Sequence, residues 1–535
     1  MAKKLAEPTP PNPKAELNKE SLERLAEART KKSYVELDFR ECYFFCAPQR
    51  QRTISSMTEP STQRMLDAPE LNTDEAFLLC QDFVTEVINT FMPEAQPWCR
   101  RGPGMDIADG AWAKVKEAVS KDDDKIFDAM KASNLYPELA KAFYPDLAIG
   151  TVAAWIDRPH PSKPITVSAV PLRELEINLG PYGEVDDRFA VRYTRNSYVK
   201  ELVGDDVWAK MPALMKQKIE EKPSVRTQVI WGFWRDWADI GDETWFRVVL
   251  VGDELVDDGK LTGEGSCPLW VARFNPSADW PHGIGPMIQG LPSFRQIDEL
   301  ESMLIENAEL ALVPPITYPS DSFTNIEQGL EPRMAYPIQP GHEKAVQAIY
   351  QVPPAAPGTY AYEDKLKKLK KLFYVDMPEQ SGDTPPTLGQ WLDEMARAQR
   401  RIGTPGLSFW REGPAKIFSR FQHLLEMSGA IKPLKVDGRA VATLPMNPAQ
   451  AAAEQQEVAM AMKAVQFLGQ AFPEEFKMFV DGEKSIKAII DKMRVSGLLK
   501  LRDPKAVKDA VAQMAPLVAG RHAPGAPDQP PGPAA

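Results

Sequence analysis

Apolar residues recur every three or four positions in several long stretches of the chain, and this is the spacing of an amphipathic α-helix. The first stretch covers residues 15–46. The second covers 73–91, where Asn72 is expected to cap the first turn with Glu75 three residues on. Helical spacing continues over 106–148 with polar breaks. The first third is therefore predicted to be mainly α-helical.

From about residue 164 the pattern changes to short apolar runs separated by turn residues, which is typical of β-strands. The predicted strands are 165–170 (ITVSAV), 175–179 (LEINL), 189–193 (FAVRY), 225–234, 244–250 and 268–274. Their short connections favour an antiparallel sheet.

Helical spacing returns after the sheet. It predicts a helix over 291–313, which ends at two prolines, and a shorter amphipathic helix over 361–374. The proline-rich stretch 314–359 between them is far longer than an ordinary loop, so we expect a small subdomain there. Further helices are predicted over 387–402, 414–430, 448–471 and 473–498.

Composition narrows the class of protein. The chain has 535 residues, of which 43% are hydrophobic, enough for more than one domain. The formal charge of -11 argues against a surface that wraps nucleic acid, because such binding rests on Lys and Arg. Neither a membrane-spanning stretch nor the apolar core of a secretory signal is found, so we expect a protein that is cytosolic when made and does not enter a membrane.

The common catalytic and metal-binding motifs are missing. Gly259-Lys260 is followed by Leu261 and not by the Ser or Thr of a phosphate-binding loop. Gly406-Leu-Ser408 does not continue into the Gly-x-Ser-x-Gly turn of a hydrolase, and the five histidines lie far apart. We therefore expect no catalytic residues, no cofactor and no metal site.

Three residue clusters leave two interpretations each. Cys42 and Cys46 are either core thiols, which we favour, or part of a metal site. Four tryptophans could stack on bases but fit sheet packing better: Trp231, Trp234, Trp237 and Trp245. A dense basic patch is either a solvated face or a contact for DNA phosphates or an acidic partner: Lys365, Lys367, Lys368, Lys370 and Lys371. Acid pairs such as Asp186-Asp187 are expected on the surface.

Several short phrases, in this order, resemble the portal proteins (head-to-tail connectors) of short-tailed bacteriophages. They are 146–152 (DLAIGTV), 170–174 (VPLRE), 183–186 (GEVD), 191–194 (VRYT), 282–286 (HGIGP), 385–391 (PPTLGQW) and 442–448 (ATLPMNP). The resemblance covers roughly residues 30–510. It departs from the family at His282 and Ile284, where members often carry Tyr and Arg.

The resemblance implies an α+β, mainly α, portal fold. The implied parts are a flexible arm (1–14), a wing (15–290), a first stem helix (291–313), a clip (314–359), a second stem helix (360–375), a channel loop (376–390), wing helices (391–445), crown-side helices (446–515) and a disordered tail (516–535). The candidate channel-loop residues are Glu379, Gln380, Ser381, Gly382 and Asp383.

The resemblance also implies the partners and the place of action. It implies a homo-oligomeric ring of about twelve subunits at one capsid vertex, with double-stranded DNA passing through it. The implied protein partners are the terminase large subunit, the major capsid protein, the scaffolding protein and tail adaptor proteins. The expected location is the virion, and the host cytoplasm during assembly. On this view the five lysines face the channel or the partner at the clip.

Two other classes share the acidic charge and the lack of motifs. The first is a virion protein without a channel, such as a head-tail adaptor or an internal core protein. The second is an enzyme with an unrecognised site, which clustered acids and a histidine in one pocket would favour. The first does not account for a long helix, a proline-rich insert and a return helix in that order, and scattered acids without a pocket would dismiss the second.

Overall fold

The computed structural model of the chain describes residues 13–48, 71–103, 109–160, 162–238, 243–312, 316–317, 347–348, 356–375, 403–433, 435–436, 439–445 and 461. The chain divides into two compact units, 1–449 and 450–535. Of the second unit only Ala461, which is helical, is described.

The first third is mainly α-helical, as predicted. Its helices are α1 (Pro13–Ser33), α2 (Glu36–Cys46), α3 (Glu75–Phe91), α4 (Asp109–Ala132), α5 (Leu135–Phe143) and α6 (Asp146–Ile149). The single helix predicted over 15–46 is broken at residues 34–35. The predicted cap at Asn72 is wrong: the hydroxyl of Thr73 accepts from the Glu75 N–H at 3.3 Å, while Asn72 binds Asp298.

Two antiparallel sheets replace the single predicted one. The first has the order β3-β2-β9, and the second has the order β4-β5-β6-β7-β8. The strands are β2 (Thr151–Asp157), β3 (Thr166–Val170), β4 (Leu175–Leu179), β5 (Val185–Arg195), β6 (Arg226–Arg235), β7 (Thr244–Val251), β8 (Glu254–Thr262) and β9 (Leu269–Arg273). A 3-10 turn, η1 (Leu172–Glu174), joins β3 to β4.

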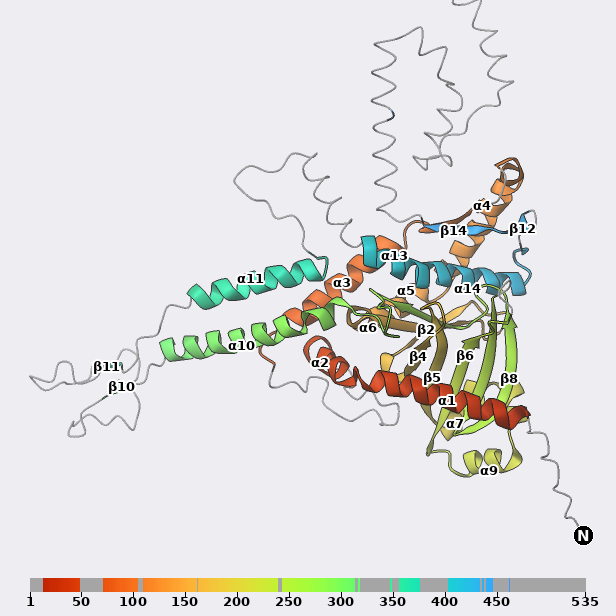
Figure 1. Ribbon diagram of the computed structural model, residues 1–535, viewed down its shortest axis with the longest axis horizontal. Coiled ribbons are helices and arrows are strands. Elements are labelled where there is room, and N and C mark those ends of the chain that lie inside the picture. The colour runs from red at the N-terminus through yellow and green to blue at the C-terminus, as the bar shows by residue number, and fades with distance from the viewer. Residues whose placement is uncertain are drawn as a thin grey trace, which may run out of the picture. The chain divides into compact units, whose positions relative to one another are not determined.

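Helix α1 lies across one face of the five-stranded sheet (Figure 1). Side chains alternate along a strand, so Phe189 and Val191 of β5 pack with Leu25 of α1. Ala190, between them, belongs to the main core on the other face. The sheet is therefore buried on both faces: the main core covers one face and α1 covers the other.

Smaller elements complete the described part. Three short helices join β5 to β6: α7 (Asn196–Val203), α8 (Asp205–Lys210) and α9 (Ala213–Glu221). The helices α13 (Gly403–Glu412) and α14 (Pro414–Met427) follow later in the chain. Two-stranded pairs are formed by β1 (Cys99–Gly102) with β14 (Ala442–Pro445) and by β12 (Lys435–Val436) with β13 (Arg439–Ala440).

Two long helices, α10 (Pro286–Leu312) and α11 (Ala356–Leu372), lie side by side (Figure 1). Both predicted helices are confirmed, but each begins five residues earlier than expected. α10 continues through Pro292, which lies inside the helix. A proline near the start of a helix removes one hydrogen bond but does not end the helix. Of the later predicted helices, α14 is confirmed, while 387–402, 473–498 and all of 448–471 except Ala461 lie outside the described residues.

Candidate functional site

We call α10 and α11 the helical hairpin. A Cβ on Gly290 would lie 3.1 Å from Leu369, and one on Gly358 would lie 3.2 Å from Leu304. The start of α10 thus lies against the end of α11, and the end of α10 lies against the start of α11. The two helices are therefore antiparallel. Beyond the hairpin, β10 (Ile316–Thr317) pairs antiparallel with β11 (Gln347–Ala348), so the outgoing and returning chain segments pair with each other.

Glycine, leucine and phenylalanine residues form the contact between the two helices. The rings of Phe294 and Phe373 meet edge to face at 5.8 Å, and both side chains are fully buried. Tyr362 donates a hydrogen bond to Glu75 at 3.4 Å. Burial, followed by the charges of Glu75 and Glu301, raises the pKa of Tyr362 to about 12, so its hydroxyl stays a donor. This contact joins the hairpin to the start of α3.

The five predicted lysines all lie on α11. Four of them are exposed and Lys365 is partly buried. Lys368 pairs with Asp364 at 2.6 Å, one turn away. They do not form one patch, because at ~100° per residue five lysines within seven positions point to several sides of the helix. A single flat partner therefore cannot contact all five at once. The predicted channel-loop residues, Glu379 to Asp383, lie outside the described residues.

Three glycines form the junction between the hairpin and the rest of the described fold. Gly150 follows α6, while Gly283 and Gly285 precede α10. The Gly285 N–H donates to the Ile149 carbonyl at 2.8 Å, and the Gly150 carbonyl accepts from the Phe274 N–H at 2.8 Å. A Cβ on Gly283 would lie 2.1 Å from the Gly150 oxygen. Only glycine allows the two backbones to approach this closely.

His282 occupies the core beside this junction. It is fully buried, and both of its ring nitrogens lack a hydrogen-bond partner in the described part of the chain. Its ring meets Phe39 edge to face at 5.4 Å. Burial, followed by the positive charges of Lys32 and Arg273, lowers the pKa of His282 to about 3. The imidazole is therefore neutral throughout the ordinary pH range.

This histidine should make the protein less stable in mild acid. In the unfolded chain it takes up a proton below pH ~6.5, whereas the folded state does not until about pH 3, so stability is lost as the pH falls. Between pH 6.5 and 5 the loss is about 2 kcal/mol, at about 1.4 kcal/mol per pH unit. Urea unfolding of His282→Leu should show a pH dependence weaker by this amount.

The matched control for this prediction is His160→Ala, because His160 is exposed. It should keep the pH dependence of the unaltered protein. An unchanged pH dependence in His282→Leu would contradict the assignment of the acid sensitivity to this buried ring.

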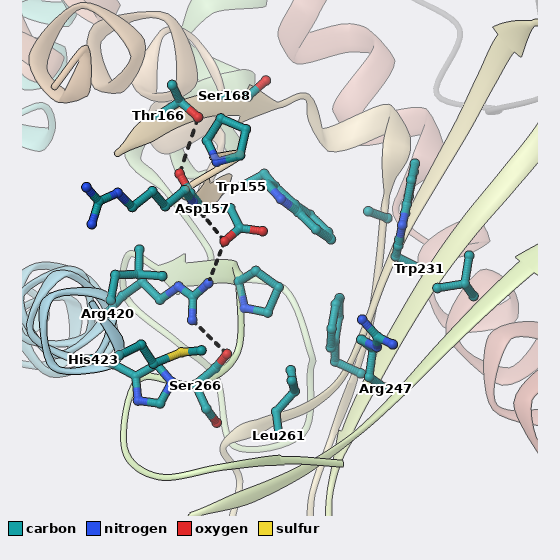
Figure 2. A pocket seen from close by; sticks show the side chains of 18 of the residues that line it. Trp155, Asp157, Thr166, Ser168, Trp231, Arg247, Leu261, Ser266, Arg420 and His423 are labelled. Carbon is teal, nitrogen blue, oxygen red and sulfur yellow. Dashed lines mark hydrogen bonds and ion pairs between the residues drawn. The ribbon is translucent and has the colours of Figure 1, made fainter. Parts of the chain in front are cut away.

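A cavity of about 1080 Å³ lies between the two sheets and α14 (Figure 2). One wall carries Trp155 and Trp231, whose ring centroids are 5.6 Å apart. The acid in the cavity, Asp157, pairs with Arg420 at 3.3 Å, and the same arginine donates to the Ser266 carbonyl at 2.8 Å. His423 of α14 also lines the cavity, and burial, followed by the positive charge of Arg420, lowers its pKa.

Three of the four tryptophans follow the favoured interpretation, while Trp237, after the end of β6, is only partly buried. Trp231, Trp234 and Trp245 are buried in the sheet, so packing is confirmed over base stacking. The expectation for Asp186 and Asp187 is wrong, because both are buried. Asp186 accepts from the Trp237 indole at 2.8 Å and Asp187 pairs with Arg24 at 2.8 Å, so these acids fix strand ends and α1.

All five cysteines are free and buried, in agreement with the core interpretation of Cys42 and Cys46. Burial raises the pKa of the Cys42 thiol well above its usual value, so the reactive thiolate is disfavoured. Within the described ranges, no group of three or more potential ligands could hold a metal ion. No helix of that same part is long and apolar enough to cross a membrane.

The glycine junction was not recognised as a site in the sequence, although both of its segments were singled out there. The two phrases 146–152 and 282–286 lie far apart in the chain and meet backbone to backbone in the structure. The signal in the sequence was the pair of glycines, Gly283 and Gly285, directly before Pro286 and a long helix. The sequence alone does not show which other segment packs against this pair.

Comparison with known proteins finds one family model and several solved structures that match the chain. The family model described as "Bacteriophage head to tail connecting protein" matches residues 18–496. No curated protein sequence matches. A chain from the neck of an empty gene transfer agent particle, computed with C6 symmetry, is 12% identical with a TM-score of 0.38, over 78% of this chain and 90% of that one. A chain from the virion of a native gene transfer agent particle is 12% identical with a TM-score of 0.39, over 78% and 93%. Since the family model spans most of its length, the chain belongs to the bacteriophage head to tail connecting protein family.

Proposed function

We propose that the protein is a portal protein. It forms a ring, of about twelve subunits, at one capsid vertex. Double-stranded DNA enters the capsid through the ring during packaging and leaves through it during ejection. The observation that carries the proposal is the helical hairpin within a chain of the connector family, with a proline-rich insert between its two helices.

In this proposal α10 and α11 are the stem helices and the insert at 314–359 is the clip. The described helices and sheets before residue 286 form the wing, together with α13 and α14. The acidic balance of the chain suits a channel, because strong binding of phosphates would hold DNA where it has to slide.

The partners that we propose are the proteins that would contact such a ring at a capsid vertex. The terminase large subunit docks at the clip and drives packaging with its own ATPase, so the portal itself is no enzyme. Tail adaptor proteins later take the place of the terminase, while scaffolding protein and major capsid protein contact the wing. The site of action is the virion, and the host cytoplasm during assembly. A head-tail adaptor or internal core protein is the alternative, and the hairpin with its insert favours the portal.

Replacing the five lysines of α11 with glutamine tests the DNA channel. Each subunit should still fold, because the apolar contact of the hairpin is untouched, and the ring should still assemble. The yield of DNA-filled particles should fall at least about tenfold, because charges that guide the phosphates are lost. The measurement is nuclease-protected DNA per particle in a packaging reaction.

The control replaces the same five lysines with arginine, which keeps the charge. It should package normally. Normal packaging by the glutamine variant would overturn the role of these lysines, and absence of rings in the unaltered protein would overturn the portal proposal itself.

A further inference from the structure

The cavity between the two sheets and α14 plays no part in the portal function proposed above. Its volume of about 1080 Å³ is close to the upper end of the range of small-ligand sites, which is about 300–1,000 Å³. Its lining is also typical of such sites, because apolar and aromatic side chains predominate and a few polar groups lie among them. The cavity is therefore a candidate binding site.

One wall of the cavity is a face of the five-stranded sheet. Trp231 and Phe233 of β6 are two residues apart, so they point to the same face. The register pairs Phe233 with Arg247 of β7, which places the arginine on that face too. Trp155 of β2 meets this wall from the other sheet, with its ring centroid 5.6 Å from that of Trp231 and 5.7 Å from that of Phe233. Figure 2 shows Trp155, Trp231 and Arg247 around the cavity.

The lining of the cavity is rich in positive charge, although the chain as a whole has a formal charge of -11. Among the described residues of the lining, Asp157 is the one acid and four are arginines: Arg158, Arg192, Arg247 and Arg420. Asp157 pairs with Arg420 at 3.3 Å, and Arg192 pairs with Glu174 at 3.0 Å. Such a lining favours an anionic ligand over a neutral or cationic one.

Arg247 is the arginine best placed to hold an anion. It pairs with the buried Asp257, but that carboxylate also pairs with Lys210, so two cations share one acid. The Nε of Arg247 has no hydrogen-bond partner among the described residues. This guanidinium therefore keeps both positive charge and donor capacity for a ligand.

Ser266 supplies a second polar group to the lining, next to Arg420 (Figure 2). The residue is 3% exposed, and its Oγ has no hydrogen-bond partner in the described part of the chain. A buried hydroxyl without a partner is destabilising, and a ligand atom that accepts from it would remove that cost.

We propose that this cavity binds a small aromatic anion, such as an aromatic carboxylate. The flat ring of the ligand packs against Trp155 and Trp231, its anionic group is held by Arg247, and the Ser266 hydroxyl donates a hydrogen bond to it. A ligand in this position contacts both sheets and α14, so it stabilises the folded subunit. The inference goes beyond the portal function and does not depend on it.

The test compares three probes of the same shape and different charge. They are naphthoate, the neutral naphthalenemethanol and the cationic naphthylmethylamine, each titrated into the full chain by isothermal titration calorimetry. One naphthoate should bind per chain, at least about tenfold more tightly than the alcohol, because only the carboxylate forms charge-assisted hydrogen bonds with the guanidinium. The amine should bind more weakly than the alcohol.

Arg247→Met locates the anionic group of the probe. The variant loses the guanidinium, while the buried Asp257 keeps Lys210 as its counterion. The affinity for naphthoate should fall at least about tenfold, to that of the alcohol, and the affinity for the alcohol should stay the same. A merely structural role of Arg247 would lower both affinities together. The matched control is Arg295→Met, which removes an arginine paired with Glu41 outside the cavity and should change neither affinity.

Trp155→Leu locates the aromatic ring of the probe. Naphthoate and the alcohol should both bind at least about fivefold more weakly, because the stacking surface is lost for both. The matched control is Trp280→Leu. Trp280 is likewise partly buried beside another ring, that of Tyr34 at 6.3 Å, but it does not line the cavity.

Four results would overturn the inference. They are equal affinities for naphthoate and the amine, an unchanged preference for naphthoate in Arg247→Met, an equal loss in either control variant, and no binding of naphthoate to the full chain. The last result would also be seen if a neighbouring copy of the chain covered the cavity. Octanoate, an anion without a ring, should bind at least about fivefold more weakly than naphthoate, and equal affinity would overturn the aromatic part of the proposal.

Discussion

Replacing Gly285 with alanine is expected to lower the free energy of unfolding by at least about 3 kcal/mol. The added Cβ would lie 2.2 Å from the carbonyl oxygen of Ala148 and 2.6 Å from the carbonyl carbon of Ile149. Both are backbone atoms, which cannot rotate away as a side chain can. The Gly285 N–H would also lose its 2.8 Å hydrogen bond to Ile149 if the segment moved. Urea unfolding measures the loss.

Gly110→Ala is the matched control for this substitution. Gly110 lies in α4, and an added Cβ there meets nothing within 4 Å. Its stability should stay the same or rise by up to about 1 kcal/mol, since alanine is the better helix former. Equal stability of the two variants would contradict the role of the glycine junction.

Removing the carboxylate of Glu412 should cost about 3–5 kcal/mol, because it leaves a buried arginine without its counterion. Arg273 at the end of β9 is 2% exposed, and Glu412 at the end of α13 accepts from its Nε at 3.0 Å and from its Nη2 at 2.5 Å. Glu412 also accepts from the backbone N–H of Arg273 at 3.0 Å. The pair thus fixes α13 to the three-stranded sheet next to the glycine junction. Urea unfolding of Glu412→Ala is the measurement.

The exposed pair of Glu117 and Lys121 on α4 gives the comparison. Its atoms are 2.9 Å apart, but both side chains lie in solvent. Glu117→Ala should therefore leave the unfolding midpoint unchanged. A loss in Glu412→Ala no larger than that in Glu117→Ala would show that the Arg273 charge is solvated in some other way.

The long helices could be predicted because their apolar residues follow a regular period. In α10 the buried Leu291, Phe294 and Ile297 recur at three-residue intervals. The strands β3 to β7 and β9 were also predicted, because turn residues separate their apolar runs. For these elements the local pattern was sufficient.

Two strands of the large sheets, β2 and β8, were missed. β2 is almost entirely buried, so it shows no alternation, and its sequence joins directly to the helical stretch before it. β8 was missed for another reason: Asp257 lies in the middle of it, paired with Arg247 and Lys210. A buried acid looks like a turn residue until its partners are known.

The candidate site depends still more on contacts between distant segments. The sequence identified the lysines, but only the structure shows that they are spread around α11. The meeting of Gly150 with Gly283 and the unpartnered ring of His282 arise from tertiary packing. No local pattern encodes such contacts, because each residue by itself fits many surroundings.

Electron microscopy of the purified full chain, with class averages along the particle axis, tests the central claim most directly. The portal account predicts closed rings of about a dozen subunits around a hole wide enough for duplex DNA. Compact monomers or dimers that form no ring even at high protein concentration would contradict it.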